Sequence, residues 1–266
     1  MSHAVEQISD PADPRLADYA HIGDPGWLRD RDLFVAEGRL VVERLAGAGR
    51  FRIRSMLLTQ TTQQALAERM AAPPCPVFLA SRQIMETITG FSFHQGCLAL
   101  AERGPALPLS SLDAGRWMLG IEGVGNPDNV GGLFRTAEAF GMDGVLLGAG
   151  SGDPLYRKAI RASMGAALRL PFVTSDAFAD SLAELRRTVT LVALTPQSPS
   201  LAVEDYRRTR PTGGGTLLLV GAEGPGLSAQ VLSLADVRVS IPLLHGVDSL
   251  NVVVAAGIAM AALRPA

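Results

Sequence analysis

Three polar loops in the second half of the chain carry the side chains most able to do chemistry. The first follows an apolar run and has the sequence Glu122-Gly-Val-Gly-Asn-Pro-Asp-Asn-Val-Gly-Gly132. Its glycines place backbone amides near a helix N-terminus, where anions are favoured, and Arg135 follows one to two turns later. The loop therefore predicts either a phosphate site or a tight turn in which Asn129 caps the helix.

The second loop, Gly221-Ala-Glu-Gly-Pro-Gly226, follows an apolar strand and precedes a helix. A dinucleotide site would need the spacing G-x-G-x-x-G, but this loop has G-x-x-G-x-G, and Pro225 removes a backbone amide. We therefore do not expect a nicotinamide cofactor. Glu223 could receive a ligand hydroxyl, hold Arg135, or be a solvated loop acid.

The third loop runs from Ile241 into an apolar helix that we expect to begin near Ser249. Ser249 is of a residue type that often caps helices. Asn251 is expected inside the first turn among valines, where an unpaired buried amide would be costly. His245 is the histidine nearest this loop's polar residues, and no histidine has partners spaced for a nucleophilic triad.

Apolar strands alternate with helices through this half of the chain. Strands are predicted over 116–122, 144–148, 170–174, 189–194 and 216–220, and helices over 129–140, 154–168 and 176–187. Such alternation of continuous apolar strands with helices predicts an α/β fold, a parallel sheet with helices on both faces. The second and third loops would then lie at the same edge of the sheet, where α/β proteins bind ligands. Residues 207–215 are predicted to be mobile.

The first half predicts a smaller α/β domain. We expect a surface leader over 1–25, a domain over 26–105 and a linker over 106–115. Within the domain, a helix is predicted over 33–45, followed by alternating strands (50–59, 76–80, 96–101) and helices (62–70, 81–88). Arg50, Arg52 and Arg54 would project from one strand face, where they could meet a nucleic-acid backbone or form a solvated edge.

Composition limits the possible functions. Apolar residues make up 47% of the 266 residues, enough for a packed core, and no run is long enough to span a bilayer. The N-terminus shows no secretory signal, and the two cysteines form neither a disulfide framework nor a zinc set, so we expect no metal and a cytoplasmic location. The net charge of −2 argues against a protein that binds nucleic acid by charge alone. Lys158 is the only lysine, which fits either phosphate recognition by arginine or codon bias in a GC-rich genome.

Three motifs, in order and spacing, resemble those of the SpoU (TrmH) family of RNA ribose 2'-O-methyltransferases, of the SPOUT class. They are Asn126-Pro-Asp-Asn-Val-Gly-Gly-Leu-Phe-Arg-Thr-Ala-Glu-Ala-Phe-Gly141, then Leu219-Val-Gly-Ala-Glu-Gly-Pro-Gly-Leu227, then Ile241-Pro-Leu to Ser249-Leu-Asn-Val-Val-Val-Ala255. The resemblance implies a methyltransferase domain over 116–266 with a C-terminal trefoil knot. It also implies bound S-adenosyl-L-methionine and a site at a homodimer interface. More loosely, the first domain is similar to the substrate (RNA)-binding domain of many members, through Glu37-Gly38 and His94-Gln95-Gly96.

Site residues follow from the resemblance position by position. The implied catalytic residues are Asn129, Arg135, Glu223, Ser249 and Asn251. The backbone around Leu194, Thr195, Pro196, Gly221, Ile241 and Leu250 would hold the cofactor. The sequence departs from the family where a second serine is usual, at Val253, and it lacks the frequent Tyr-Glu pair near the C-terminus.

The sequence therefore predicts an enzyme, an S-adenosylmethionine-dependent methyltransferase of structured rRNA or tRNA that forms a homodimer and contacts no membrane. The alternative is a non-catalytic RNA-binding protein that retains the knotted fold. Its support is the near-neutral charge and Val253.

Overall fold

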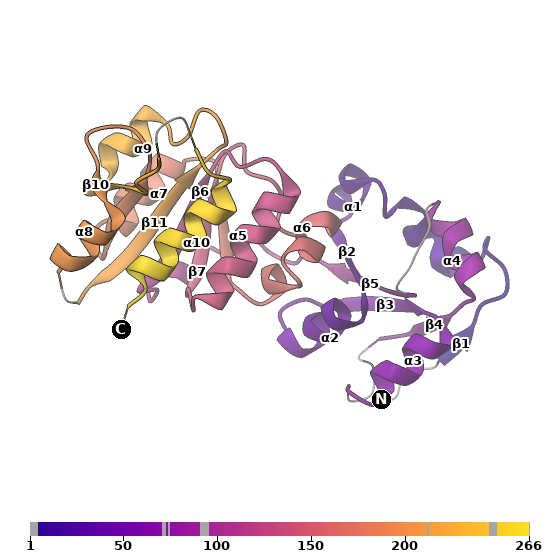
Figure 1. Cartoon of the computed structure of the whole chain (residues 1–266). Coiled ribbons are helices and arrows are strands. Elements are labelled where there is room, and N and C mark those ends of the chain that lie inside the picture. Colours follow the sequence, from indigo (N-terminus) through magenta and orange to yellow (C-terminus); the bar gives the residue numbers. More distant parts are fainter. Residues whose placement is uncertain are drawn as a thin grey trace. The chain divides into compact units, whose positions relative to one another are not determined.

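The computed structural model describes residues 5–70, 73, 75–90, 96–211, 213–244 and 249–265. Contacts divide the chain into two compact units (Figure 1). The first consists of Met1–Pro105 with Leu155–Arg169, and the second of Ala106–Pro154 with Leu170–Ala266. Among the described residues, no helix has the length and apolar character needed to cross a membrane.

A seven-stranded sheet in which every pair of neighbours is parallel forms the centre of the second unit. Its strand order is β10-β12-β9-β11-β6-β7-β8. The bounds are β6 Trp117–Glu122, β7 Gly144–Gly148, β8 Phe172–Ser175, β9 Val189–Leu194, β10 Leu201–Ala202, β11 Gly215–Gly221 and β12 Val237–Ser240. The predicted α/β fold with a parallel sheet is confirmed.

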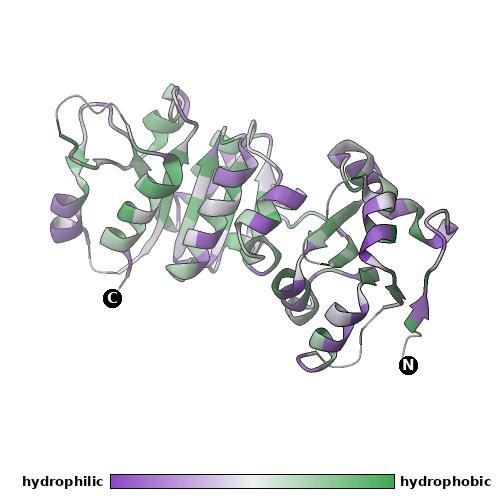
Figure 2. Ribbon diagram, turned by 45° about the vertical axis from the view of Figure 1, so that its right-hand side comes forward, coloured by the Kyte–Doolittle hydropathy of each residue, from purple (hydrophilic) through white to green (hydrophobic). Residues whose placement is uncertain are grey.

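Helices cover this sheet because its strands are apolar on both faces. Side chains alternate between the faces along each strand. On one face, Met118, Leu146 and Leu217 pack with α7 (Phe178–Leu185) and α9 (Ala229–Leu234). On the other side α5 (Pro127–Ala139) and α10 (Val252–Leu263) lie together, as Figure 1 shows. Figure 2 shows the hydrophobic residues concentrated in the strands and in the C-terminal helix.

Two helices of this unit begin at residues other than those predicted. Asn126, not Asn129, is the N-cap of α5, and its side chain accepts from the Asp128 amide at 2.9 Å. Asn251 is the N-cap of α10 and is exposed, not buried in the first turn. The segment predicted as mobile is regular at both ends, since α8 spans Val203–Thr209 and β11 starts at Gly215. Because Asn126 caps α5, Asn129 does not serve as a helix cap.

The first unit has a five-stranded mixed sheet in the order β1-β4-β3-β5-β2. Its strands are β1 Val5–Gln7, β2 Leu33–Glu37, β3 Ile53–Leu58, β4 Val77–Leu79 and β5 Cys97–Glu102. Strands β1, β3 and β4 pair in parallel, and β5 pairs antiparallel with both β3 and β2. Helices α2 (Arg39–Ala48), α3 (Gln60–Ala67) and α4 (Arg82–Thr89) follow β2, β3 and β4.

The helix predicted over 33–45 is wrong in its first part. Residues 33–36 are fully buried and form β2, and Gly38, with φ of 98°, separates this strand from α2. A short apolar run fits a buried strand and a helix equally well by its spacing, so periodicity could not decide. The glycine at a left-handed φ was the available signal of a break.

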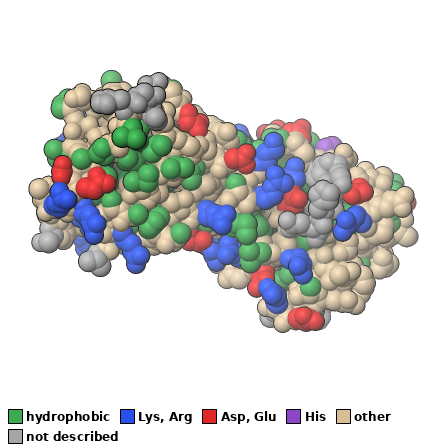
Figure 3. Space-filling model, viewed as in Figure 1, with side chains coloured by type: hydrophobic (Ala, Val, Ile, Leu, Met, Phe, Trp, Pro, Cys, Tyr) green, Lys and Arg blue, Asp and Glu red, His purple; other side chains and the backbone are tan. Residues whose placement is uncertain are grey.

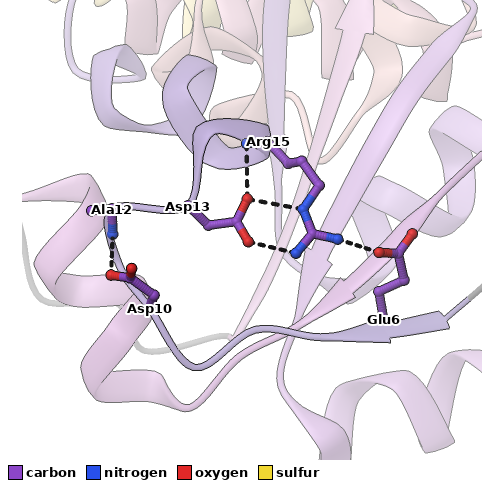
Figure 4. A network of polar contacts seen from close by, with 5 residues as sticks. All are labelled: Glu6, Asp10, Ala12, Asp13 and Arg15. Atoms are coloured by element: carbon purple, nitrogen blue, oxygen red, sulfur yellow. Dashed lines mark hydrogen bonds and ion pairs between the residues drawn. The ribbon is translucent and has the colours of Figure 1, made fainter.

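Residues 5–25, the described part of the predicted leader, belong to the first unit's core. Strand β1 pairs with β4, and η1 (Pro14–His21) is followed by α1 (Pro25–Asp30). Ile8, Leu16, Tyr19 and Ile22 are buried in one cluster. Arg15 binds both Asp13, through its Nε at 2.9 Å, and Glu6 (Figure 4). The Arg15 side chain lowers the pKa of Asp13 to about 2. The leader is therefore a folded part of this unit and not a surface strap.

Residues 155–169 also belong to the first unit, although they lie between β7 and β8 of the second unit's sheet. Arg157, at the start of α6 (Arg157–Ala162), donates to Glu37 at 2.6 Å in a mostly buried ion pair. Arg44 donates to the Met164 carbonyl. We call residues 155–169 the insert. The predicted domain over 116–266 is therefore interrupted. Within the predicted linker, Leu112 packs in the second unit's core.

Candidate functional site

A pocket lies at the carboxyl ends of β9, β11 and β12, beside the start of α10. Its cavity volume is about 170 Å³. The walls include all six residues predicted to hold the cofactor, together with two of the predicted catalytic residues: Leu194, Thr195, Pro196, Gly221, Ile241 and Leu250, with Glu223 and Ser249. Segments far apart in the sequence therefore meet at one site.

The order of the strands in the sheet explains why these distant segments come together at the pocket. β11 pairs with β6 on one side and with β9 on the other, so consecutive strands in the chain are not neighbours here. The carboxyl edge of such a sheet opens a crevice at the strands where the order reverses. The loops after β9, β11 and β12 all emerge at that edge.

Gly221 allows the second loop to fold back on itself. A Cβ at this position would lie 2.2 Å from the Gly226 carbonyl carbon, so no side chain fits. The Gly226 amide donates to the Ala222 carbonyl at 2.9 Å, and Leu227 is buried behind the loop. This closure leaves the side chain of Glu223 exposed at the pocket wall.

Three of the predicted catalytic residues form one hydrogen-bond chain. The Asn129 Nδ2 donates to Glu223 Oε1, and the Asn251 Nδ2 donates to Asn129 Oδ1 at 3.1 Å. The Asn251 Oδ1 in turn accepts from the Val253 amide at 2.9 Å. The start of α10 thus fixes Asn251, and Asn251 helps to fix Asn129. Glu223 is bound to Asn129, whereas one of the alternatives from the sequence paired it with Arg135.

The other two predicted catalytic residues lie apart from this chain. Arg135 is exposed on α5, and among the residues that the structure describes its side chain has no hydrogen bond or ion pair. Ser249 is exposed on the pocket wall, two residues before the helix cap. His245 lies outside the described residues, as do His94 and Gln95.

Arg50, Arg52 and Arg54 are in the first unit, and of the three only Arg54 lies within β3. β3 begins at Ile53, and its pairing with β5 shifts register between Ile53 and Ser55. Arg50 stacks on the Phe51 ring at 4.8 Å. Arg52 and Arg54 both pair with Glu102, at 3.1 and 3.8 Å. Their contact with RNA stays a prediction.

Sequence reasoning missed Glu122 as a support of the site. Its Oε2 accepts from the Ser228 amide at 2.8 Å and so joins the end of β6 to the start of α9. The signal was available, because a carboxylate at the carboxyl end of a buried strand is well placed to cap a neighbouring helix. Val220, Ala222, Gly224, Leu243, Val252 and Ala255 also line the pocket without having been predicted.

The pocket wall is chemically simple. It is mostly backbone and aliphatic side chain, and Glu223 is the only charged residue among its described lining. No group of three histidines, cysteines or acids suited to a metal ion is present among the described residues. An apolar wall with one carboxylate suits an uncharged ring system or a cationic ligand better than a pyrophosphate, which needs donors or positive charge.

Comparisons with known proteins match the whole of this architecture. The profile of the SpoU rRNA Methylase family matches residues 117–261. A Mycobacterium tuberculosis protein named as an uncharacterized tRNA/rRNA methyltransferase is 37% identical, over 96% of this chain and 90% of its own length. A Bacillus subtilis 23S rRNA (guanosine(2553)-2'-O)-methyltransferase is 27% identical, over 98% of this chain and 100% of its own. The crystal structure of an AdoMet-bound rRNA methyltransferase from Sinorhizobium meliloti has a TM-score of 0.82 at 24% identity, covering 98% and 97%.

The fold and the matched segment define an α/β protein of the RNA methyltransferase class. The family profile begins at the first residue of β6 and ends within α10, so it spans every element that lines the pocket. The chain belongs to the SpoU rRNA methylase family. The resemblance found in the sequence is confirmed.

Proposed function

We propose that this protein is an S-adenosylmethionine-dependent methyltransferase that methylates a ribose 2'-hydroxyl in structured RNA, either rRNA or tRNA. The observation that carries the proposal is the hydrogen-bond chain from Glu223 through Asn129 to Asn251 at the wall of the pocket. The B. subtilis relative named as a 2'-O-methyltransferase supports the position of the transferred methyl group. A bacterial rRNA or tRNA substrate would place the protein in the cytoplasm.

The residues present fit S-adenosylmethionine. The aliphatic walls, including Leu194, Ile241 and Leu250, suit its adenine ring, and the Glu223 carboxylate suits its positive charge. The cofactor supplies an activated methyl group. Gly221 leaves room for backbone to approach the ligand, because the loop has no side chain there. The S. meliloti structure, solved with AdoMet bound, has the same fold.

The chain's own contribution is positioning. Asn129 cannot rotate freely, because it donates to one partner and accepts from another. A hydroxyl held in line with a methyl donor loses much of the barrier that comes from orientation. A guanidinium group is a poor general base, so we assign Arg135 to the phosphate next to the target ribose, where it also polarises the hydroxyl.

We also propose that the chain through β11, β12 and α10 forms a trefoil knot and that the first unit binds the RNA substrate. Two features support the knot: β11 enters the sheet between β6 and β9, and α10 returns to lie beside α5. Support for RNA binding comes from relatives that match this unit as well as the second, since the M. tuberculosis relative covers 96% of the chain.

A homodimer is proposed through the exposed apolar side of α10. Val254 and Ile258 lie one turn apart and are 51% and 37% exposed, and Leu244 is 87% exposed. Figure 3 shows hydrophobic side chains gathered on the side of the second unit where Figure 1 shows α10. The variant V254D/I258D is expected to sediment as a monomer. V5D, at a 48% exposed valine of β1, is the control and should sediment as the wild type does.

Transfer of labelled methyl groups from S-adenosylmethionine to bulk RNA tests the proposed reaction. We expect labelled 2'-O-methyl nucleosides after digestion, and one methylated position that disappears from total RNA when the gene is deleted. Cofactor binding without transfer to any RNA would instead favour the non-catalytic RNA-binding protein. Binding of NADH with no binding of S-adenosylmethionine would reject the proposed cofactor.

A further inference from the structure

A groove in the first unit lies at the carboxyl ends of three of its strands. β2, β3 and β4 run in the same direction, because β3 pairs in parallel with β4 and both β2 and β3 are antiparallel to β5. α2, α3 and α4 therefore all start at this edge. The groove is lined by residues from those starts, from the end of α3 and from the insert, among them Arg39, Thr59, Thr62, Arg69, Arg82 and Met164.

Positive charge dominates the groove. Arg39 and Arg82 are the first residues of α2 and α4, and both are exposed. Arg69 is 3.6 Å from Glu43, the one acid among the lining residues. Arg39 has no side-chain hydrogen bond or ion pair among the described residues, so its guanidinium is available to a ligand. The described lining of the groove thus has three guanidinium groups and one carboxylate.

Hydroxyl and amide donors line the same groove. Thr59 and Thr62 hydroxyls contact each other at 2.9 Å, and a Cβ at Gly96 would lie 2.7 Å from the Thr59 hydroxyl. A side chain at position 96 would therefore crowd these hydroxyls. At the start of α2, Gly38 provides no side-chain cap, so the first amides of that helix keep their hydrogen-bonding capacity.

We propose that this groove binds the phosphodiester backbone of the RNA substrate. The inference rests on the proposed function. Guanidinium groups match phosphate oxygens in two-point contacts, and hydroxyls and backbone amides are common phosphate donors. Leu40, Ala65, Leu66 and Met164 also line the groove, but its arginines and hydroxyls favour a phosphate-bearing partner over a protein with an apolar centre.

The insert connects the groove to the methyltransferase sheet along the chain. Met164 is on the groove wall, and its carbonyl is held by Arg44. The chain reaches Met164 only after leaving β7, and from there it continues directly to β8. RNA in the groove thus contacts a segment that is tethered at both ends to the sheet bearing the cofactor pocket.

Two double variants of the full-length protein distinguish RNA binding in this groove from RNA binding by the arginines at the start of β3. R39Q/R82Q removes two arginines from the groove, and R52Q/R54Q removes two arginines outside it that pair with Glu102 and Asp18. Binding to deproteinised bulk rRNA is measured at several salt concentrations, together with S-adenosylmethionine binding and thermal melting. R39K/R82K, which keeps the charges, is the third variant.

R39Q/R82Q is expected to bind rRNA about tenfold more weakly and to reduce the slope of log affinity against log salt by about one to two. R52Q/R54Q should bind as the wild type does, R39K/R82K should keep the wild-type slope, and cofactor binding and melting should not change in any variant. Wild-type affinity and slope in R39Q/R82Q would overturn the groove while leaving the methyltransferase proposal intact. Loss confined to R52Q/R54Q would overturn it in favour of the strand. Absence of methyl transfer by the wild type, with rRNA binding still lost in R39Q/R82Q, would reject the proposed reaction and support the groove.

Discussion

Asn129 is the residue on which the polar chain of the site depends, because both atoms of its amide are used. Replacement by aspartate keeps the acceptor for Asn251 but puts a carboxylate against Glu223. A hydrogen bond to a charged group contributes about 1.5–3 kcal/mol, so we expect N129D to lower turnover by about 10- to 100-fold. Single-turnover methyl transfer measures this loss.

A charge swap provides the control for this prediction. In N129D/E223Q the glutamine amide can donate to the new aspartate, and the net charge of the wild type is restored. We expect the double variant to recover part of the turnover that N129D loses, and E223Q alone to bind the cofactor. Equal turnover in N129D and the double variant would show that the contact between positions 129 and 223 does not matter for the reaction.

Arg135 differs from these residues because it is exposed and has no partner within the described structure. A lysine keeps the charge but loses the planar fork that contacts two oxygens at once. R135K is therefore expected to lose less than about tenfold in RNA affinity and at least about tenfold in turnover. RNA titration and single-turnover kinetics measure the two effects, and near-normal turnover would contradict the assigned role.

At the scale of elements, the contact between α5 and α10 positions Asn129 and Asn251. Gly132 of α5 faces Val253 of α10, and a Cβ on Gly132 would lie 2.8 Å from a Val253 methyl group. We expect G132A to destabilise the second unit by about 1–3 kcal/mol through overpacking. Urea denaturation measures the change, and methyl transfer should fall as well, because the two asparagines separate.

A smaller side chain at position 253 tests whether overpacking causes the loss of stability in G132A. G132A/V253A should be more stable than the sum of the two single changes predicts, since the alanine at 253 removes the colliding methyl groups. G47A in α2 is the matched control: nothing lies within 4 Å of a Cβ there, so it should stabilise by about 0.5–1 kcal/mol. Additive effects at 132 and 253 would reject direct contact as the reason.

The elements that could be predicted from sequence are those decided by local pattern. β7 and β9 have the predicted bounds, because each is a short, mainly apolar run with glycine or polar residues on both sides. The start of α5 differs from the predicted one. Asn126 and Asn129 have the same residue type, and only the backbone conformation decides which of them caps the helix. β2 was missed because its apolar run is compatible with both periods.

At the scale of the whole molecule, strand order and unit membership could not be predicted from local pattern. The meeting of the loops after β9, β11 and β12 depends on β11 inserting between β6 and β9, which no local signal encodes. Resemblance to the family supplied the residues of that pocket. It gave no warning that the insert packs in the first unit, because the ion pair of Arg157 with Glu37 joins residues far apart in the sequence.

The first unit has two buried thiols and a buried phenol, and these groups lower its free energy of unfolding at alkaline pH. Burial raises the pKa of the Cys75 thiol to about 11 and of the Cys97 thiol to about 12, and it also raises the pKa of Tyr19. At pH 7 and below these groups are neutral in both the folded and the unfolded chain. Above pH 9 the unfolded thiols lose protons while the folded ones keep them, so the free energy of unfolding falls as pH rises.

In the full-length protein, this decrease in the free energy of unfolding can be followed for the first unit separately. The chain has two tryptophans, and in W117F the remaining Trp27 reports on the first unit. Trp117 is a suitable position to change, because its buried Nε1 has no partner among the described residues. We expect Cys97 to contribute a loss on the order of 1 kcal/mol between pH 8 and pH 10. W117F/C97A should therefore show a smaller difference between these pH values than W117F, although it is less stable at both. An equal difference in the two proteins would mean that the Cys97 thiol ionises in the folded unit as readily as in the unfolded chain.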